Sequence, residues 1–271
     1  MEFAPSEILK PFVQKYIVVN ITDTIENEIF YPSGFIDLVI RSSGYAATSI
    51  NGTFKSTPEM ELLGHLTLPT TVSAWKGTEI LIARLYPYSC SLFFKNPISD
   101  FTNSATNIFL VNSKEAKELY DKIGSCQSLL KKINLLECYL IGKLRESERT
   151  YASVVNVSRI CNYITNNIEA FSTKKISDEI GVSERYIQKQ FQERVGLQPV
   201  SLHASHRFIK SLNQIISTQS SLTSIAYDCG YYDQAHFVKE FKRFTGIAPL
   251  QARKSLTKND EENRKAVNVG L

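Results

Sequence analysis

Two segments in the last third of the chain concentrate side chains that can hydrogen-bond to nucleic-acid bases. Arginine, lysine and glutamine recur there on the side of each segment opposite its apolar residues. Arginine and lysine pair with guanine in the major groove of DNA, and glutamine pairs with adenine. The solvated face of a helix has the same composition, so one such segment alone does not decide the matter. The candidate base-reading residues are Arg185, Gln188, Lys189 and Gln192 in the first segment, and Gln234, His236, Val238 and Lys239 in the second.

An internal duplication contains both segments. Gly181 and Gly230 are 49 residues apart, whereas Phe191 and Phe241 are 50 residues apart. The second copy therefore has one extra residue, which we place at the start of its second helix. Two copies that display glutamine and lysine on matching faces favour DNA reading over a merely solvated surface.

Each copy has the pattern of a helix-turn-helix. A short helix ends at a glycine, which adopts the left-handed conformation that closes a helix. Ser183 is a candidate N-cap of the next helix, and Asp233 places negative charge at the corresponding helix start. Gly-x-x-Pro ends each unit. The apolar stripe comprises Val182, Ile187, Phe191 and Val195 in the first copy, and Phe237, Phe241 and Phe244 in the second.

A continuous helix is predicted between the two copies, over Val200–Ser217. About 18 residues at 1.5 Å per residue give roughly 27 Å. Such a helix can hold two reading helices near one turn of the duplex, roughly 34 Å.

The charge distribution points to a polyanionic partner for this part of the chain. The whole chain has a net charge of +4, and the segment Val155–Ser255 alone has 13 Lys and Arg against 8 Asp and Glu. Contacts to phosphates position a protein on DNA without reading sequence. The candidate phosphate-binding residues are Lys174, Lys175, Ser183, Lys242 and Arg243.

The first hundred residues are β-rich, which together with the helical rear part predicts an α+β chain of two domains. Turn residues such as Asn51-Gly52 separate short apolar runs, a pattern typical of a barrel or sandwich. We expect a β-rich sensor or dimerisation domain at 1–149, a DNA-binding domain at 150–256 and a flexible tail at 257–271. The predicted strands are Tyr16–Ile21, Ile36–Arg41, Tyr45–Asn51, Glu59–Leu63, Thr71–Trp75 and Glu79–Tyr86.

Two helices are expected after the strands, at Ser113–Ile123 and Ser125–Arg149, followed by a polar linker at Glu146–Ala152. The second helix has one apolar stripe at helical spacing. The stripe either covers the β-rich domain or forms a homodimer interface, and both interpretations remain open from the sequence. Its residues are Leu129, Ile133, Leu136, Leu140 and Leu144.

The rear segment resembles the paired helix-turn-helix units of AraC/XylS transcription regulators. The stretches Gly181–Phe191 and Asp228–Pro249 carry the resemblance, which covers about 100 residues. It implies a seven-helix DNA-binding domain and base-reading roles for the outward positions. Arg207 matches a recurrent arginine of the connecting helix, for which we expect a structural role with an acidic partner such as Asp228. Tyr232 departs from the family, where many members have a small capping residue.

The front segment resembles the cupin-like sensor domain that precedes this unit in many relatives. The resemblance lies in Pro32–Ile40, Leu63–Thr67 and Ile82–Pro87, and it implies effector-binding or dimerisation duties. A pocket with an arginine would suit an anionic effector. The alternative, that the aromatic residues are core and the arginines lie on the surface, is favoured. The candidate pocket residues are Phe30, Tyr31, Arg41, Trp75, Arg84 and Tyr86.

Several other classes of function lack support in the sequence. No apolar run is long enough for a membrane span, and the N-terminus does not resemble a signal peptide. The five cysteines are scattered and read as reduced thiols of a cytoplasmic protein. Only His65 precedes His203, so we expect no metal, no cofactor and no cupin metalloenzyme. His203 and His206 are interpreted as surface histidines on a helix.

These features together predict a transcription regulator that binds double-stranded DNA and is not an enzyme. Candidate further partners are RNA polymerase, a small-molecule effector and a second copy of the chain. The alternative is a sensor or interaction protein whose helix-turn-helix units are degenerate.

Overall fold

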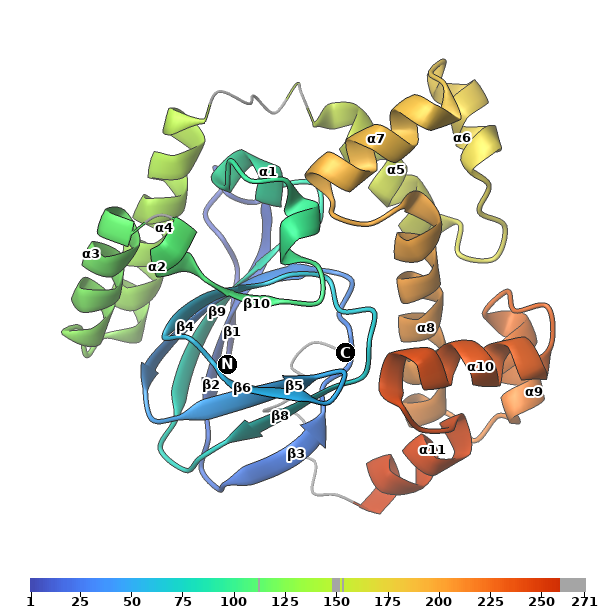
Figure 1. Cartoon of the computed structure of the whole chain (residues 1–271), viewed down its shortest axis with the longest axis horizontal. Coiled ribbons are helices and arrows are strands. Elements are labelled where there is room, and N and C mark those ends of the chain that lie inside the picture. The colour runs from blue at the N-terminus through green and yellow to red at the C-terminus, as the bar shows by residue number, and fades with distance from the viewer. Residues whose placement is uncertain (112, 148–151, 153, 259–271) are drawn as a thin grey trace.

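The computed structural model describes residues 1–111, 113–147, 152 and 154–258. Figure 1 shows a β-rich front domain, and beside it a helical rear domain built around one long helix. Ten strands of the described residues form two antiparallel sheets. The larger sheet has the order β1 (Glu2–Phe3), β2 (Val13–Asn20), β9 (Glu79–Leu85), β4 (Ile36–Ser43), β7 (Met60–Leu63) and β10 (Ala105–Asn107). The smaller sheet has the order β3 (Ile25–Ile29), β8 (Thr70–Ala74), β5 (Ala46–Ile50) and β6 (Thr53–Ser56).

All six predicted strands are present, within three residues at each end. The four strands that were not predicted have weak signals for a physical reason. β1 and β10 are only two and three residues long. β6 is exposed at every position, and β3 reads Ile-Glu-Asn-Glu-Ile, so neither β6 nor β3 is a strongly apolar run.

The larger sheet separates two environments. Alternate residues of its central strands point to opposite faces. On β4, Ile36, Leu38 and Ile40 belong to the main apolar core. The intervening Asp37 and Arg41 line a cavity between the two sheets. The same alternation holds on β7 and β9, so the polar side chains of three adjacent strands face one cavity.

Helices cover the other face of the larger sheet. These are α2 (Ile108–Val111), α3 (Ser113–Gly124) and α4 (Leu129–Glu146) (Figure 1). Before them, α1 (Cys90–Phe93) and η1 (Ile98–Phe101) lead from the sheet toward the rear domain. The predicted bounds of α3 and α4 are confirmed to within four residues. The expected linker at 146–152 and the expected tail at 257–271 fall largely outside the described residues.

The apolar stripe of α4 packs on the chain's own β-rich domain. Ile133, Leu136 and Leu140 are buried in the main core, and Leu129 and Leu144 pack against it. The homodimer interpretation of this stripe is therefore wrong, because its side chains are already covered. The stripe protects the sheet, which was the other interpretation left open by the sequence.

Within residues 154–258 the rear domain has seven helices. The helices are α5 (Val155–Asn166), α6 (Thr173–Ile180), α7 (Glu184–Arg194), α8 (Pro199–Ser217), α9 (Leu222–Asp228), α10 (Gln234–Thr245) and α11 (Pro249–Lys258). Two apolar cores lie along α8. Leu202 of α8 packs with α5, α6 and α7, whereas Phe208 and Leu212 pack with α9, α10 and α11.

The front domain contacts both cores of the rear domain. Tyr88 and Leu92 belong to the first core, and Tyr31 belongs to the second. At the first contact, the Thr102 hydroxyl donates a hydrogen bond to the carbonyl oxygen of Gly196 at 2.8 Å. Gly196 has φ +84°, and a Cβ at this position would lie 2.7 Å from the carbonyl oxygen of Ile98. Only glycine satisfies both the conformation and this close approach.

The two environments of α4 give a matched test. Replacing Leu140, which is fully buried, by alanine should lower the free energy of unfolding by about 2–5 kcal/mol. Replacing Leu130, which is 63% exposed on the same helix, should change it little. Urea denaturation of both variants measures the difference. Equal effects, or a change of mass by sedimentation in Leu140→Ala alone, would restore an interface role for the stripe.

Candidate nucleic-acid interface

The first helix-turn-helix is formed by α6 and α7. Ser172 caps α6, and α6 closes at Gly181, whose φ of 75° is left-handed. The predicted N-cap of α7 is confirmed, because the Ser183 hydroxyl accepts a hydrogen bond from the backbone N–H of Tyr186 at 3.2 Å. Ile187 and Phe191 are fully buried in the first core. The opposite face is thereby fixed, and it exposes Arg185, Gln188, Lys189 and Gln192.

The second unit is formed by α9 and α10. Asp233 is the N-cap of α10, because its Oδ1 accepts a hydrogen bond from the backbone N–H of His236 at 2.7 Å. Tyr232, the departure from the family pattern, precedes the cap and is 87% exposed. Gln234, His236 and Lys239 are exposed, whereas Val238 is half-buried against the second core.

The extra residue of the second copy lies in the turn, not at the start of the helix as the spacing alone suggested. Phe191 lies eight positions after the cap Ser183, and Phe241 lies eight positions after the cap Asp233. The two reading helices are therefore in register when 50 is added to each number of the first. The matching pairs are Arg185 with Ala235, Gln188 with Val238, Lys189 with Lys239, and Gln192 with Lys242. Among these four pairs only Lys189 and Lys239 are of the same residue type, so the two helices present different chemistry at matching positions.

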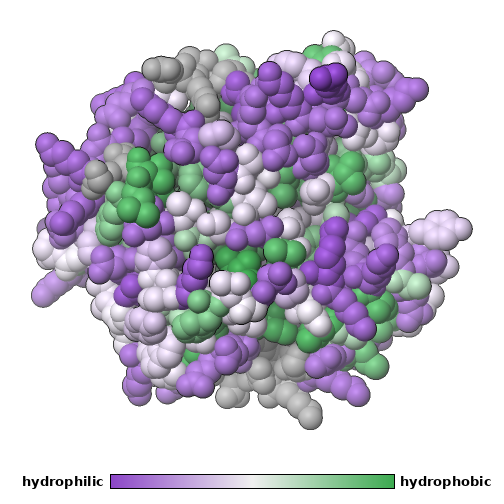
Figure 2. Space-filling model, viewed as in Figure 1, coloured by the Kyte–Doolittle hydropathy of each residue, from purple (hydrophilic) through white to green (hydrophobic). Residues whose placement is uncertain are grey.

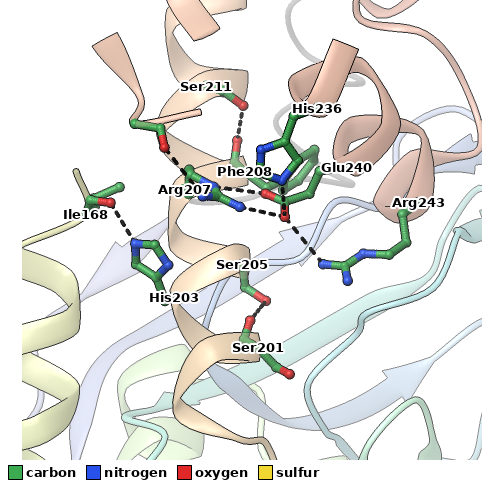
Figure 3. A network of polar contacts seen from close by, with 11 residues as sticks. Ile168, Ser201, His203, Ser205, Arg207, Phe208, Ser211, His236, Glu240 and Arg243 are labelled. Atoms are coloured by element: carbon green, nitrogen blue, oxygen red, sulfur yellow. Dashed lines mark hydrogen bonds and ion pairs between the residues drawn. The ribbon is translucent and has the colours of Figure 1, made fainter. Parts of the chain in front are cut away.

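One ion pair joins the connecting helix to the second reading helix. Arg207 of α8 donates from Nε to Glu240 Oε1 at 3.0 Å and from Nη2 to Glu240 Oε2 at 2.7 Å (Figure 3). The guanidinium lies over the ring of Tyr231, 4.4 Å from its centroid. The expected structural role of Arg207 fits this geometry, but the suggested partner Asp228 is wrong. Asp228 is exposed, and its carboxylate accepts from the Ser224 hydroxyl.

Glu240 is not among the residues predicted from the sequence, because a charged residue beside an apolar stripe is normally expected on the surface. Phe237, Phe241 and Phe244 of α10 are buried, and Glu240 lies on the same side at only 9% exposure. His236 and Arg243 also point toward its carboxylate, at 4.0 Å and 3.9 Å (Figure 3). The sequence does contain a signal for this contact, because His236 lies four residues before Glu240 and Arg243 three residues after it, on the same side of the helix.

The two histidines of α8 are not on the surface, contrary to expectation. His203 is buried, with Nε2 2.6 Å from the carbonyl oxygen of Ile168 and its ring stacked on Phe171. His206 is half-buried, and a Cβ at Gly34 of the front domain would lie 3.1 Å from its ring. Burial lowers the pKa of His206 to about 4 and that of His65 to about 3, so both rings are neutral near pH 7.

The candidate phosphate-binding residues lie at the ends of the two units. Lys174 and Lys175 begin α6, and Lys242 and Arg243 end α10, and all four are exposed, as is Ser183. Figure 2 shows hydrophilic residues gathered over the α6–α7 end of the rear domain. Among the described residues no group of three His, Cys, Asp or Glu side chains is arranged to hold a metal ion. None of the described helices meets the length and hydropathy of a membrane span.

The candidate effector residues fall into two groups. Phe30, Arg41 and Arg84 line the cavity between the sheets. Tyr31, Trp75 and Tyr86 do not. Tyr31 packs on Phe208 of the rear domain, Trp75 on Tyr45, and Tyr86 stacks on Tyr88. The expectation that the arginines lie on the surface is wrong, because Arg84 is 3% exposed and Arg41 is half-buried.

Two family models match separate parts of the chain. Residues 176–255 match a helix-turn-helix domain, and residues 1–107 match a domain of unknown function. The name "HTH-type transcriptional activator RhaS" is carried by relatives in Escherichia fergusonii, 32% identical over 85 residues, and in Yersinia pestis, 27% identical over 99 residues. The matched regions cover 31% and 36% of this chain, and the same shares of those relatives. The chain therefore spans only about a third of the length of these curated relatives.

The comparison with solved structures also gave matches. ToxT from Vibrio cholerae is 15% identical, with a TM-score of 0.48 over 89% of this chain and 98% of that one. The C-terminal domain of AraT from Geobacillus stearothermophilus is 24% identical, with a TM-score of 0.36 over 37% of this chain and 85% of that one.

The class of the rear domain follows from its sequence match and its geometry together. The C-terminal part of the chain is a helix-turn-helix domain, with two such units in residues 172–245. It is preceded by a separate β-rich domain.

The Arg207–Glu240 pair should dominate the stability of the second unit. Arg207→Ala leaves the Glu240 carboxylate buried without its partner, which typically costs about 3–5 kcal/mol. Arg207→Met combined with Glu240→Leu should recover most of this loss, because no unpaired charge remains. Urea denaturation of the single and double variants measures both effects. Glu193→Ala, which removes a surface pair at 4.0 Å, is the control and should leave the midpoint unchanged. An equally small loss in Arg207→Ala would contradict the role assigned to the pair.

Proposed function

We propose that the chain is a sequence-specific, DNA-binding transcription regulator that inserts α7 and α10 into successive segments of the major groove. The observation that carries this proposal is the pair of helix-turn-helix units on one rigid helix, each with a buried apolar face and an exposed polar face. Figure 1 shows α7 and α10 at opposite ends of α8. α8 has 19 residues, which is about 28 Å, and this length supports docking of the two units roughly one duplex turn apart.

The two helices would read unlike half-sites. α7 offers Arg185 and Gln188 at positions where α10 offers only Ala235 and the half-buried Val238. Bidentate contacts from arginine and glutamine distinguish guanine and adenine, whereas alanine and valine can only meet the methyl group of thymine. The first unit would therefore carry more of the sequence discrimination, and the second would contribute Gln234 and Lys239.

The front domain would modulate this binding through its two contacts with the rear domain. Thr102 lies at Gly196, which ends the first unit, and Tyr31 lies against Phe208, behind the second. A change in the front domain would thus alter the relative placement of the two reading helices. An effector in the front domain or homodimerisation would supply that change, with RNA polymerase as a further partner, and such a regulator would act in the cytoplasm.

Salt dependence separates this function from that of an interaction protein with degenerate units. If Lys174, Lys175, Lys242 and Arg243 bind phosphates, log K should fall linearly with log salt, with a slope of about −0.9 for each phosphate neutralised. Lys174→Ala with Lys175→Ala should make the slope shallower by about 1–2. Lys76→Ala, on the front domain, is the control and should leave it unchanged. Fluorescence anisotropy with a selected duplex measures the slope. A flat response would favour the interaction protein.

The two-helix docking predicts two separate footprints. Arg185→Ala and Lys239→Ala should each relax base preference, at positions about one helical turn apart, with losses of roughly 1–3 kcal/mol. Binding-site selection with each variant would locate the affected base pairs. Tyr227→Ala, an exposed residue on the first helix of the second unit, serves as the control. Both substitutions acting on the same base pair would defeat the model of two inserted helices.

A further inference from the structure

A cavity of about 90 Å³ lies between the two sheets of the front domain. This is room for several water-sized groups, or for a small organic molecule. Most of its wall is apolar, with Ile21, Val72, Ile80 and Ile82 among the lining residues. Four charged side chains interrupt this wall, and they come from the three adjacent strands β9, β4 and β7. These are Arg84, Asp37, Arg41 and Glu61.

Two of the four charges neutralise each other. Arg84 lies opposite Asp37 in the register of β4 and β9. Its Nε and Nη2 donate to the two carboxylate oxygens at 3.0 Å and 2.9 Å, and both side chains are buried. A bidentate pair of this geometry is a closed unit with no net charge.

Arg41 and Glu61 each leave a polar atom unsatisfied. Arg41 donates from Nη1 to the carbonyl oxygen of Gly44 and from Nη2 to that of Thr57, but its Nε is buried without a hydrogen-bond partner. Glu61 is 4% exposed, and its Oε2 is likewise buried without a partner. Buried polar groups are normally hydrogen-bonded, so these two atoms in the wall of one cavity are available to pair with a molecule bound there.

The charge state of Glu61 indicates which kind of molecule could pair with these two atoms. Burial raises the pKa of Glu61 to about 8, although the nearby Arg41 acts in the opposite direction. Near pH 7 Glu61 is therefore mostly a neutral carboxyl group, which can donate a hydrogen bond. With the charges of Arg84 and Asp37 cancelling and Glu61 neutral, the guanidinium of Arg41 is the remaining charge among the residues that line the cavity.

We propose that this cavity binds a small, mainly apolar monocarboxylate, whose oxygens accept hydrogen bonds from Arg41 Nε and from the Glu61 carboxyl group. The negative charge of the ligand balances Arg41, and its apolar part lies against the isoleucines and valines. The inference rests on the proposed function only in assigning this ligand the role of effector.

The wall of the cavity also leads directly to the rear domain. Phe30 and Thr70 line the cavity, and the backbone N–H of Phe30 donates to the carbonyl oxygen of Thr70 at 2.8 Å. Their neighbours in the chain face the other way. Tyr31 packs on Phe208, and Pro69 lies beside Gly246 at the end of α10. A ligand that displaces the cavity wall therefore shifts one contact with α8, in the second core, and one contact with the end of α10.

The charge of the ligand is tested with three probes of equal length. Calorimetric titration of the full chain at pH 7 with pentanoate, pentanamide and pentylammonium should show pentanoate binding at least about tenfold more tightly than the others. Binding of the amide or the ammonium as tightly as pentanoate would overturn the proposal, as would no heat from pentanoate at millimolar concentration.

Glu61→Gln tests the hydrogen bond from the carboxyl group. In the unmodified chain, affinity for pentanoate should fall as pH rises from 7 to 9, because Glu61 loses the proton that it donates and becomes negative. The glutamine amide of the variant still donates a hydrogen bond and does not titrate. Glu61→Gln should therefore bind pentanoate at pH 7 within about threefold of the unmodified chain and lose this pH dependence. An unchanged pH profile in the variant would overturn the assignment.

Arg41→Gln should weaken pentanoate binding by about tenfold or more, and Lys76→Gln, on the surface of the same domain, should not. Thermal unfolding of each variant checks that it is folded, and if Arg41→Gln is not, the pH profile of Glu61→Gln decides.

DNA binding, measured separately, distinguishes the two proposals. Pentanoate binding without DNA binding would support the ligand site and defeat the proposed function. If both occur, Tyr31→Ala should retain pentanoate binding and lose the effect of pentanoate on DNA affinity. An undiminished effect in Tyr31→Ala would overturn the route through Tyr31.

Discussion

The arrangement of the rear domain depends on the ion pair between Arg207 and Glu240. α8 is shared by two apolar cores, and apolar packing alone is non-directional, so it does not fix the rotation of α10 on that helix. A bidentate guanidinium–carboxylate pair is directional, and here it is closed on one side by the ring of Tyr231. Because the pair lies at 12% and 9% side-chain exposure, any orientation of α10 that separates it leaves a buried charge. The second reading helix thus has one favoured orientation relative to the first.

The front domain adds a second constraint, because it contacts the rear domain before the start of α8 and again at the middle of α8. At the first contact, Gly196 closes the first unit directly on the carbonyl oxygen of Ile98. At the second contact, Gly34 lies against the ring of His206, and Tyr31 enters the second core. The placement of the two units therefore depends on α8, on the ion pair and on the front domain. Under the proposed function a ligand would act through the front domain, because the proposed cavity lies there.

The sequence predicts the parts of this fold that follow from short-range pattern. The 49-residue duplication, the capping residues and the apolar stripes are local, and both helix-turn-helix units follow from them. Contacts that join distant segments were predicted poorly. The sequence predicts Asp228 as the partner of Arg207, because an acid near the turn is visible in the sequence whereas the burial of Glu240 is not. The same limit explains His203 and His206, which are polar residues on a helix until Ile168 and Gly34 are brought against them. The α4 stripe shows a related ambiguity, since its period establishes an apolar face but not what covers that face.

The residues that line the cavity of the front domain follow partly from the local pattern of one strand and partly from the pairing of distant strands. The alternation of β4 is visible in the sequence, and it separates Ile36, Leu38 and Ile40 from Asp37 and Arg41. Which residues of β7 and β9 join them depends on strand register, which the sequence does not supply. The register sets Arg84 against Asp37 and Val39 against Glu61. A shift of one residue on β7 would turn Glu61 toward the helices and bring Leu62 into the cavity. The charge balance of the cavity, and therefore the class of molecule that it can bind, is a consequence of pairing between strands that lie about twenty residues or more apart in the chain.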